Sequence, residues 1–178
     1  IDAALLSRVV GGNPSEILGS LIANGHLFLV NPNGIIFGKD STVDVHALIA
    51  STLDIADSAF LSGNISFTGD SEAAVINLGS INADSFAALI GGKVTNDGSV
   101  TAPGGDVALL ASGATLEVGE AAGGKITLDL SGLLGGSAAN SGSIDVASST
   151  TKGGSVTILG GEVSSSGSTD ASGAIGGG

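Results

Sequence analysis

Short stretches in which apolar and polar residues alternate recur along most of this chain. Alternation with a period of two predicts β-strands that bury one face and expose the other. Asp44 and Asp54 fall between apolar partners, so we expect both carboxylates on an outer face. The alternating apolar sets include Val43/Val45, Leu53/Ile55, Val107/Leu109, Ile126/Leu128/Leu130 and Val156/Ile158.

A sequence motif of the form Asn-x-Gly-Ser-apolar recurs in the second half of the chain. Clear copies begin at Asn77, Asn96 and Asn140, and a worn copy begins at Ser165. The intervals of 19, 44 and 25 residues indicate a repeat of roughly 19 to 25 residues, with one unrecognisable copy inside the longest interval. Such a period is typical of a solenoid, whose stacked units bury one another's apolar positions.

A second motif, Gly-Gly-x-Val or Gly-Gly-x-Ile, recurs in phase with the first. Gly and Asn supply corner conformations, while Val, Ile and Thr suit pleated walls. One repeat thus holds two or three short strands, and coils stacked about 4.8 Å apart would join their apolar positions into one interior. We predict an all-β fold, a single-stranded parallel β-helix (β-solenoid) with a few short extra-helical strands or hairpins. The copies of the second motif begin at Gly91, Gly104, Gly123, Gly153 and Gly160.

The quality of the repeat varies along the chain, which suggests how one β-helix segment is organised. The pattern is weak before residue 75, and large apolar residues thin to Ile175 after Ser164. Within a single segment spanning 1–178 we expect a part with distinctive turns (1–57), an irregular excursion or short hairpin (58–74), regular coils (75–164) and a Gly/Ser-rich, partly frayed end (165–178).

The sharpest turn signal in the chain is Asn31-Pro32-Asn33-Gly34-Ile35-Ile36-Phe37-Gly38. Pro32 fixes its own φ and removes a donor, and Asn33 and Gly34 tolerate positive φ. Asn-Gly between apolar runs is a strong short turn signal. We therefore predict a tight turn between two extended segments.

Shorter elements precede this turn. Residues 14–18 fit either one helical turn or a short strand, and they begin at the last residue of the break Gly11-Gly12-Asn13-Pro14. We expect strands at 2–10, 20–23 and 26–30, with a turn at Asn24-Gly25 between the last two.

Composition limits both the core and the partners. Gly contributes 31 of 178 residues and Phe five, whereas Trp, Tyr, Met and Cys are missing. Such a chain cannot fill a wide core, but it can fill a narrow coil with Val, Ile, Leu and Ala. A net charge of −12 with five basic residues lacks the footprint that nucleic acid requires. No apolar stretch reaches the roughly 18 residues of a membrane helix, so we expect neither nucleic acid as a partner nor a transmembrane segment.

Residues for cofactor or metal chemistry are sparse. His26 and His46 lack Cys, Asp or Glu at metal-ligand spacing and are interpreted as wall or loop residues. Gly119 to Lys125 has the spacing of a phosphate-binding loop, but Ile126 replaces the required Ser or Thr, and an alternating strand follows where a helix is needed. Calcium-binding Gly-Gly-x-Gly-x-Asp repeats do not occur. We predict no cofactor and no metal site.

A polysaccharide-active β-helix is the catalytic alternative. Such enzymes place clustered carboxylates with an Arg or Lys outside one sheet, and a suitably spaced pair of Asp44 and Asp54 would permit acid–base hydrolysis. The only Arg is Arg8, however, and outward Asp side chains on a β surface are usually solvated. We predict that the protein is not an enzyme.

Several short sequence motifs near the start of the chain follow one another in a distinctive order. They resemble the haemagglutination-activity domain, which is the secretion domain of two-partner-secretion exoproteins such as filamentous haemagglutinin and the high-molecular-weight adhesins. The resemblance is detailed from about residue 7 to residue 57 and looser beyond. It implies a right-handed β-helix and favours the strand interpretation of 14–18. The matching motifs are Arg8 to Ser15, Gly19 to Leu21, Asn24 to Val30, the turn at 31–38 and Ala50 to Ile55.

The resemblance also implies a route and a partner. Such a domain is bound in the periplasm by the polypeptide-transport-associated domains of its outer-membrane transporter. It then crosses the outer membrane as an extended chain and folds at the cell surface. The lack of Cys suits this route, because an oxidising periplasm would otherwise close disulfide loops. Family exoproteins are often virulence adhesins, so a host cell surface or glycan would be reached through the full-length protein.

Family members carry segments that this sequence lacks. A signal peptide, an N-terminal cap and a first run of strands precede the point at which this sequence begins, and some members also carry an Asn-Pro-Asn-Leu motif. We therefore expect this chain to be part of a longer exoprotein.

The family's secretion-critical motifs correspond here to two short segments. Asn31 and Asn33 can hydrogen-bond neighbouring backbone and hold a corner, so we favour a structural role over direct contact with the transporter. The alternative function is a surface adhesin or receptor-binding β-helix in its own right. The matching residues are Asn13, Pro14, Asn31, Pro32, Asn33, Gly34 and Ile35.

Overall fold

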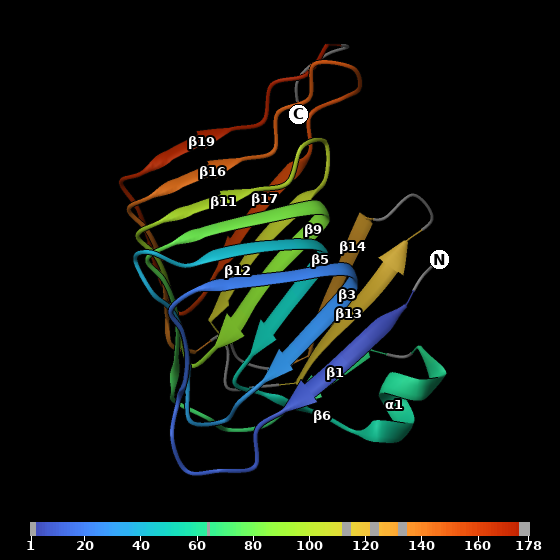
Figure 1. Cartoon of the computed structure of the whole chain (residues 1–178), viewed down its shortest axis with the longest axis vertical. Coiled ribbons are helices and arrows are strands. Elements are labelled where there is room, and N and C mark those ends of the chain that lie inside the picture. The colour runs from blue at the N-terminus through green and yellow to red at the C-terminus, as the bar shows by residue number, and fades with distance from the viewer. Residues whose placement is uncertain (1–2, 64, 112–114, 122–124, 132–134, 175–178) are drawn as a thin grey trace.

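The structure is a computed structural model that describes residues 3–63, 65–111, 115–121, 125–131 and 135–174, with side chains described outside 112–134. Short strands follow one another as coils stacked from the N-terminal to the C-terminal end (Figure 1). The described strands form a 9-stranded, a 6-stranded and a 4-stranded sheet. Strands of successive coils pair in parallel, so the predicted all-β parallel β-helix is confirmed.

Each coil runs through three walls. Wall 1 is the 6-stranded sheet, and the 9-stranded sheet bends to supply walls 2 and 3. Wall 1 contains β2 (Ser15–Ile17), β4 (Ile35–Phe37), β8 (Ala74–Asn77), β10 (Lys93–Asn96), β15 (Ser137–Asn140) and β18 (Glu162–Ser165). Wall 2 contains the first parts of β3 (Ser20–Val30), β5 (Thr42–Ser51) and β9 (Ser80–Gly91), together with β11 (Ser99–Thr101), β16 (Ser143–Asp145) and β19 (Ser168–Asp170). Wall 3 contains β1 (Ala4–Arg8), the later parts of β3, β5 and β9, β12 (Asp106–Ala111) and β17 (Ser155–Leu159).

Parallel pairing in register places equivalent side chains directly above one another. Because side chains alternate across a strand, every second residue of walls 1 and 2 points into the coil interior. Burying these columns removes apolar surface from water along the whole stack, at about 25 cal/mol per Å². One wall 2 column runs through Leu21, Val43, Ile81, Val100 and Ile144.

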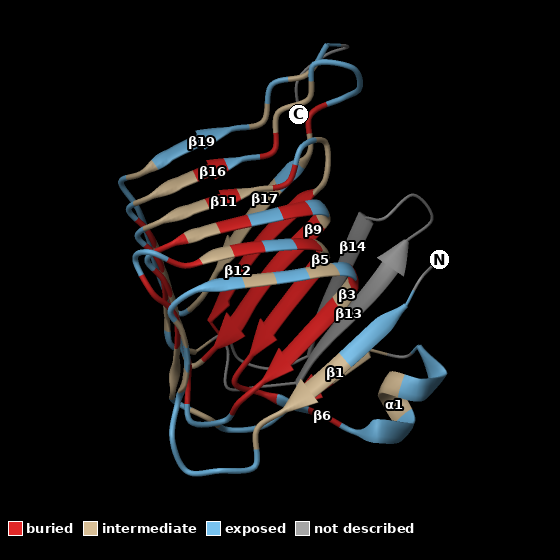
Figure 2. Ribbon diagram, in the orientation of Figure 1, coloured by how far each residue is buried: buried red, intermediate tan, exposed pale blue. Residues whose placement is uncertain are grey.

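The middle of wall 3, formed by the later parts of β5 and β9 and by β12, is buried on both faces. Leu48 and Leu89 point into the coil interior, whereas Phe28, Ile49 and Ile90 belong to a second apolar cluster on the other face. Figure 2 shows the later parts of β5 and β9 buried along their length. A strand buried on both faces needs a second layer against it.

The covering layer comes from two excursions out of the coils. They form the 4-stranded antiparallel sheet, in the order β14-β13-β7-β6, and Phe67 of this sheet is fully buried in the second cluster. Part of the first excursion is a short helix, which the sequence did not predict. The elements are β6 (Asp54–Ile55), α1 (Asp57–Ser62), β7 (Ile65–Thr68), β13 (Thr115–Ala121) and β14 (Lys125–Ser131).

The second excursion corrects the expected number of repeats. Asn96 and Asn140 are 44 residues apart in sequence, yet β10 pairs directly with β15 and aligns these two residues. No coil lies between them. The long interval therefore contains one coil and the β13–β14 hairpin, and the prediction of an unrecognised repeat copy was wrong.

One further expectation differs from the structure. The predicted turn at Asn24-Gly25 is a register shift inside the continuous strand β3, because the coil bends there while its backbone stays extended. Within the end that is expected to be partly frayed, β19 pairs with β16 and continues the stack. Residues 175–178 lie outside the described residues.

Candidate functional site

The predicted tight turn at Asn31 joins wall 3 to wall 1. The Asn31 N–H donates to the Ser51 carbonyl of the next coil at 3.0 Å, and the Gly34 N–H donates to the Asn31 carbonyl at 3.0 Å. The second bond closes a four-residue turn, after which β4 begins at Ile35. Asn31 and Ile35 are both completely buried.

Both the nitrogen and the oxygen of the Asn31 side-chain amide form hydrogen bonds. Its Nδ2 donates to the Asn13 carbonyl at 3.0 Å and to Ser15 Oγ at 2.9 Å, and its Oδ1 accepts from the Asn33 N–H at 2.9 Å. A buried amide is stable only when its polar atoms are paired. Here the pairing ties the turn to a segment 18 residues earlier.

Asn33 and Pro32 lie on the exposed rim of the turn. Asn33 Nδ2 donates to the Gly11 carbonyl at 2.7 Å and also contacts Asn31 Oδ1 at 3.2 Å. The Pro32 carbonyl accepts from Ser71 Oγ at 2.7 Å. The rim therefore contacts both the preceding coil and the first excursion.

Gly34 is the position where the turn needs a glycine. Its φ is +115°, and a Cβ added there would lie 3.2 Å from the Ala74 carbonyl oxygen and 3.6 Å from Pro14 Cβ. A residue other than glycine would therefore be strained in its backbone as well as crowded.

The structure thus brings all the predicted motif residues together, from Asn13-Pro14 on one side and 31–35 on the other. Sequence reasoning missed Ser15 and Ser71, which also hold the turn. Ser15 directly follows the Asn13-Pro14 motif and was within reach of that argument. Ser71 lies in the segment without a readable repeat, so no sequence signal pointed to it.

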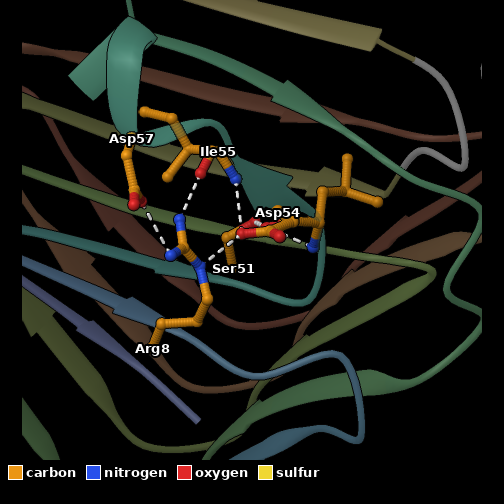
Figure 3. A network of polar contacts seen from close by, with 6 residues as sticks. Arg8, Ser51, Asp54, Ile55 and Asp57 are labelled. Carbon is orange, nitrogen blue, oxygen red and sulfur yellow. Dashed lines mark hydrogen bonds and ion pairs between the residues drawn. The ribbon is translucent and has the colours of Figure 1, made fainter. Parts of the chain in front are cut away.

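Arg8 forms a second polar cluster, on the outside of wall 3 (Figure 3). Its Nε and one terminal nitrogen donate to Asp54 and Asp57 at 2.8 Å each, and the other terminal nitrogen donates to the Ile55 carbonyl. Hydrogen bonds to Asp57 and then Asp54 raise the pKa of Arg8 above its ordinary value. The cluster ties β1 to β6 and α1.

The two carboxylates considered for acid–base catalysis are engaged by different partners. Asp54 pairs with Arg8, whereas Asp44 Oδ1 accepts from Asn82 Nδ2 at 2.7 Å. The Asp54 contact joins β6 to β1, whereas the Asp44 contact joins two neighbouring strands of wall 2.

His26 and His46 lie in adjacent coils with their rings stacked, 5.4 Å between centroids. His46 Nδ1 lies 3.5 Å from Asp84 Oδ2. Among the described residues, no group of three or more His, Cys, Asp or Glu side chains is placed to hold a metal ion. Gly123 and Gly124 of the phosphate-loop candidate lie outside the described residues. The described part of the chain also has no helix with the length and hydropathy needed to span a membrane.

Comparison with known proteins agrees with this geometry. A family model described as the TPS secretion domain, for two-partner secretion, matches residues 2–175. The crystal structure of the HMW1 secretion domain from Haemophilus influenzae superposes with a TM-score of 0.83 and 30% identity, covering 97% of this chain and 46% of that chain.

Two relatives of known sequence are heme/hemopexin-binding proteins of Haemophilus influenzae. One is 37% identical over 122 residues, which is 63% of this chain and 13% of the relative. The other is 41% identical over 66 residues, which is 37% of this chain and 7% of the relative. The match thus involves a small part of these long proteins. The chain belongs to the family of secretion domains of two-partner-secretion exoproteins, large bacterial proteins that cross the outer membrane to the cell surface or the extracellular space.

Proposed function

We propose that this chain is the segment by which its exoprotein is recognised in the periplasm by the polypeptide-transport-associated domains of a dedicated outer-membrane transporter. After crossing the membrane, the same segment forms the first coils on which the rest of the exoprotein folds. The chain acts by recognition and folding, and not by catalysis.

One observation carries the assignment of roles within the motif. Asn31 is completely buried and its side-chain amide holds the Asn13 segment, whereas Pro32 and Asn33 are exposed. A buried side chain offers no surface to a folded partner. We therefore assign Asn31 to holding the first coils together once the chain folds, and the exposed rim, Pro32 and Asn33, to any contact that the folded chain makes.

The test compares Asn31→Ala and Asn33→Ala in two measurements, the free energy of unfolding and capture by the periplasmic domains of the transporter. Asn31→Ala removes four side-chain hydrogen bonds and leaves buried polar groups unpaired, so we expect a loss of roughly 2–4 kcal/mol of stability. Asn33→Ala removes contacts at an exposed site and should cost about 1 kcal/mol or less.

The matched control is Asn82→Ala, which removes an exposed amide with one side-chain partner on wall 2. Equal stability of the Asn31→Ala variant and the parent chain would contradict the structural role of Asn31. Unchanged capture of the Asn33→Ala variant, with normal folding, would show that this side chain is not a transporter contact. Failure of the parent chain to be captured, both when folded and when freshly diluted from denaturant, would contradict the recognition function itself.

Binding to host molecules is proposed for other parts of the exoprotein. The relatives are named for binding heme and hemopexin, and this chain matches 13% or less of them. We expect the isolated chain to leave the absorption spectrum of heme unchanged and not to adhere to host cells. Specific adhesion by the isolated chain would instead support the adhesin alternative.

A further inference from the structure

Three asparagines at the same position of successive coils form a continuous column inside the stack. Asn77, Asn96 and Asn140 end β8, β10 and β15, and parallel pairing aligns them. They are 0%, 0% and 1% exposed. We call these three residues the asparagine ladder.

The hydrogen bonds donated by the side chains of the ladder all point towards the C-terminal end of the stack. Asn77 Nδ2 donates to Asn96 Oδ1 at 2.8 Å and to the Ser99 carbonyl at 3.1 Å. Asn96 Nδ2 repeats this pattern with Asn140 Oδ1 at 2.8 Å and the Ser143 carbonyl at 3.3 Å. The amide NH₂ groups of Asn77 and Asn96 are therefore satisfied by the coil that follows each of them in sequence.

The two ends of the ladder are not equivalent. At the N-terminal end, the aligned residue of the preceding coil is Phe37, and Asn77 Oδ1 accepts from the Gly79 N–H of its own turn at 3.2 Å. At the C-terminal end, Asn140 Nδ2 is buried and has no hydrogen-bond partner. The residue aligned above Asn140 is Ser165, whose side chain is shorter than that of Asn.

We infer that the asparagine ladder gives the folding of this stack an N-to-C direction. A finished coil presents an amide NH₂ whose two acceptors both belong to the next coil, so adding that coil satisfies donors that would otherwise be buried unpaired. Growth in the opposite direction would leave only carbonyl oxygens uncovered at the edge, and these tolerate a missing partner better than N–H groups do. The Asn77 oxygen is in addition already paired within its own turn.

This inference deepens the folding part of the proposed function. It concerns the purified chain in the absence of the transporter. Failure of the transporter to capture the chain would therefore leave it intact, and its own failure would leave the recognition function intact.

The test uses Asn→Asp substitutions, since Asp keeps the accepting oxygen and, when ionised, loses the donor. Asn96→Asp removes two donated bonds, whereas Asn140→Asp removes a donor that has no partner. Both sites are buried, so Asn140→Asp is the matched control for placing a carboxylate in the column. Refolding above neutral pH is followed by pulsed hydrogen exchange in two segments, 74–96 and 137–170.

In the parent chain we expect segment 74–96 to become protected before segment 137–170. Asn96→Asp should slow protection of 137–170 roughly tenfold and leave 74–96 nearly unchanged. Asn140→Asp should slow 137–145 by less than about threefold. Simultaneous protection of both segments in the parent chain, or equal effects of the two substitutions, would overturn the inference.

A gain-of-function variant tests the same inference without loss of folding. Ser165→Asn supplies the acceptor that Asn140 Nδ2 lacks, so the ladder gains one step. We expect slower hydrogen exchange in 162–170 in the folded state. Unchanged or faster exchange there would contradict the assigned direction.

Discussion

Arg8 shows how a single side chain joins parts of the molecule that are far apart in sequence. Its guanidinium reaches Asp54 and Asp57 from β1, the wall 3 strand at the edge of the sheet. The Arg8 side chain is 28% exposed and its partners 54% and 75%, so water and salt screen both pairs. Arg8 therefore holds β1 in place with a modest energy.

We predict that Arg8→Gln lowers the free energy of unfolding by about 0.5–1 kcal/mol in low salt, and by less in high salt. Urea denaturation at two salt concentrations measures both values. Lys39→Gln removes the same charge from an exposed site and serves as the control. A loss that does not depend on salt would show that packing of the Arg8 stem, and not its charge, is what matters.

At the scale of the element, glycine decides how closely two coil corners approach. Gly142 lies above Gly98, and a Cβ added at Gly142 would lie 2.0 Å from the Gly98 carbonyl oxygen. A backbone atom cannot move aside without shifting the coil. The Gly of the Asn-x-Gly-Ser motif is therefore required because the corners of stacked coils lie too close together for a side chain.

We predict that Gly142→Ala lowers stability by about 1–3 kcal/mol or more, because the corner must move apart from the coil below. Thermal unfolding followed by circular dichroism measures the change. Gly12→Ala is the control, since a Cβ there meets no atom within 4 Å. Similar melting temperatures for the two variants would mean that the corners are not close-packed.

The sequence predicted strands and corners better than it predicted the connections between them. Val43 and Val45 alternate in burial as expected, because this pattern depends only on local geometry. The bend inside β3 was read as a turn, since Asn24-Gly25 has turn composition whether or not the backbone stays extended. The tight turn at Asn31-Gly34 was predicted correctly from Pro32 and the Asn-Gly pair.

At the scale of the whole molecule, a second layer completes the stack. The 4-stranded antiparallel sheet combines strands from two excursions that are about 50 residues apart. It packs on the outer face of wall 3, where Phe28, Ile49 and Ile90 would otherwise meet water. An exposed apolar patch of this kind promotes association.

We predict that replacing 112–134 with a short Gly-Ser linker leaves the coils folded but uncovers part of wall 3. Far-ultraviolet circular dichroism should keep its β signal, whereas binding of a hydrophobic dye and self-association, measured by light scattering, should increase. Dye binding at the level of the parent chain would indicate that the remaining strands, β6 and β7, are enough to cover wall 3.

The sequence alone determined the class of fold, the coil corners and the family, because these depend on local alternation, on turn residues and on short sequence motifs. Only the tertiary structure decided which segments meet. It placed Asn13 against Asn31, stacked Asn96 on Asn140 across 44 residues, and paired the two excursions in one sheet. The physical reason is that a solenoid tolerates insertions of any length at its corners, so sequence distance does not reveal which coil lies on which.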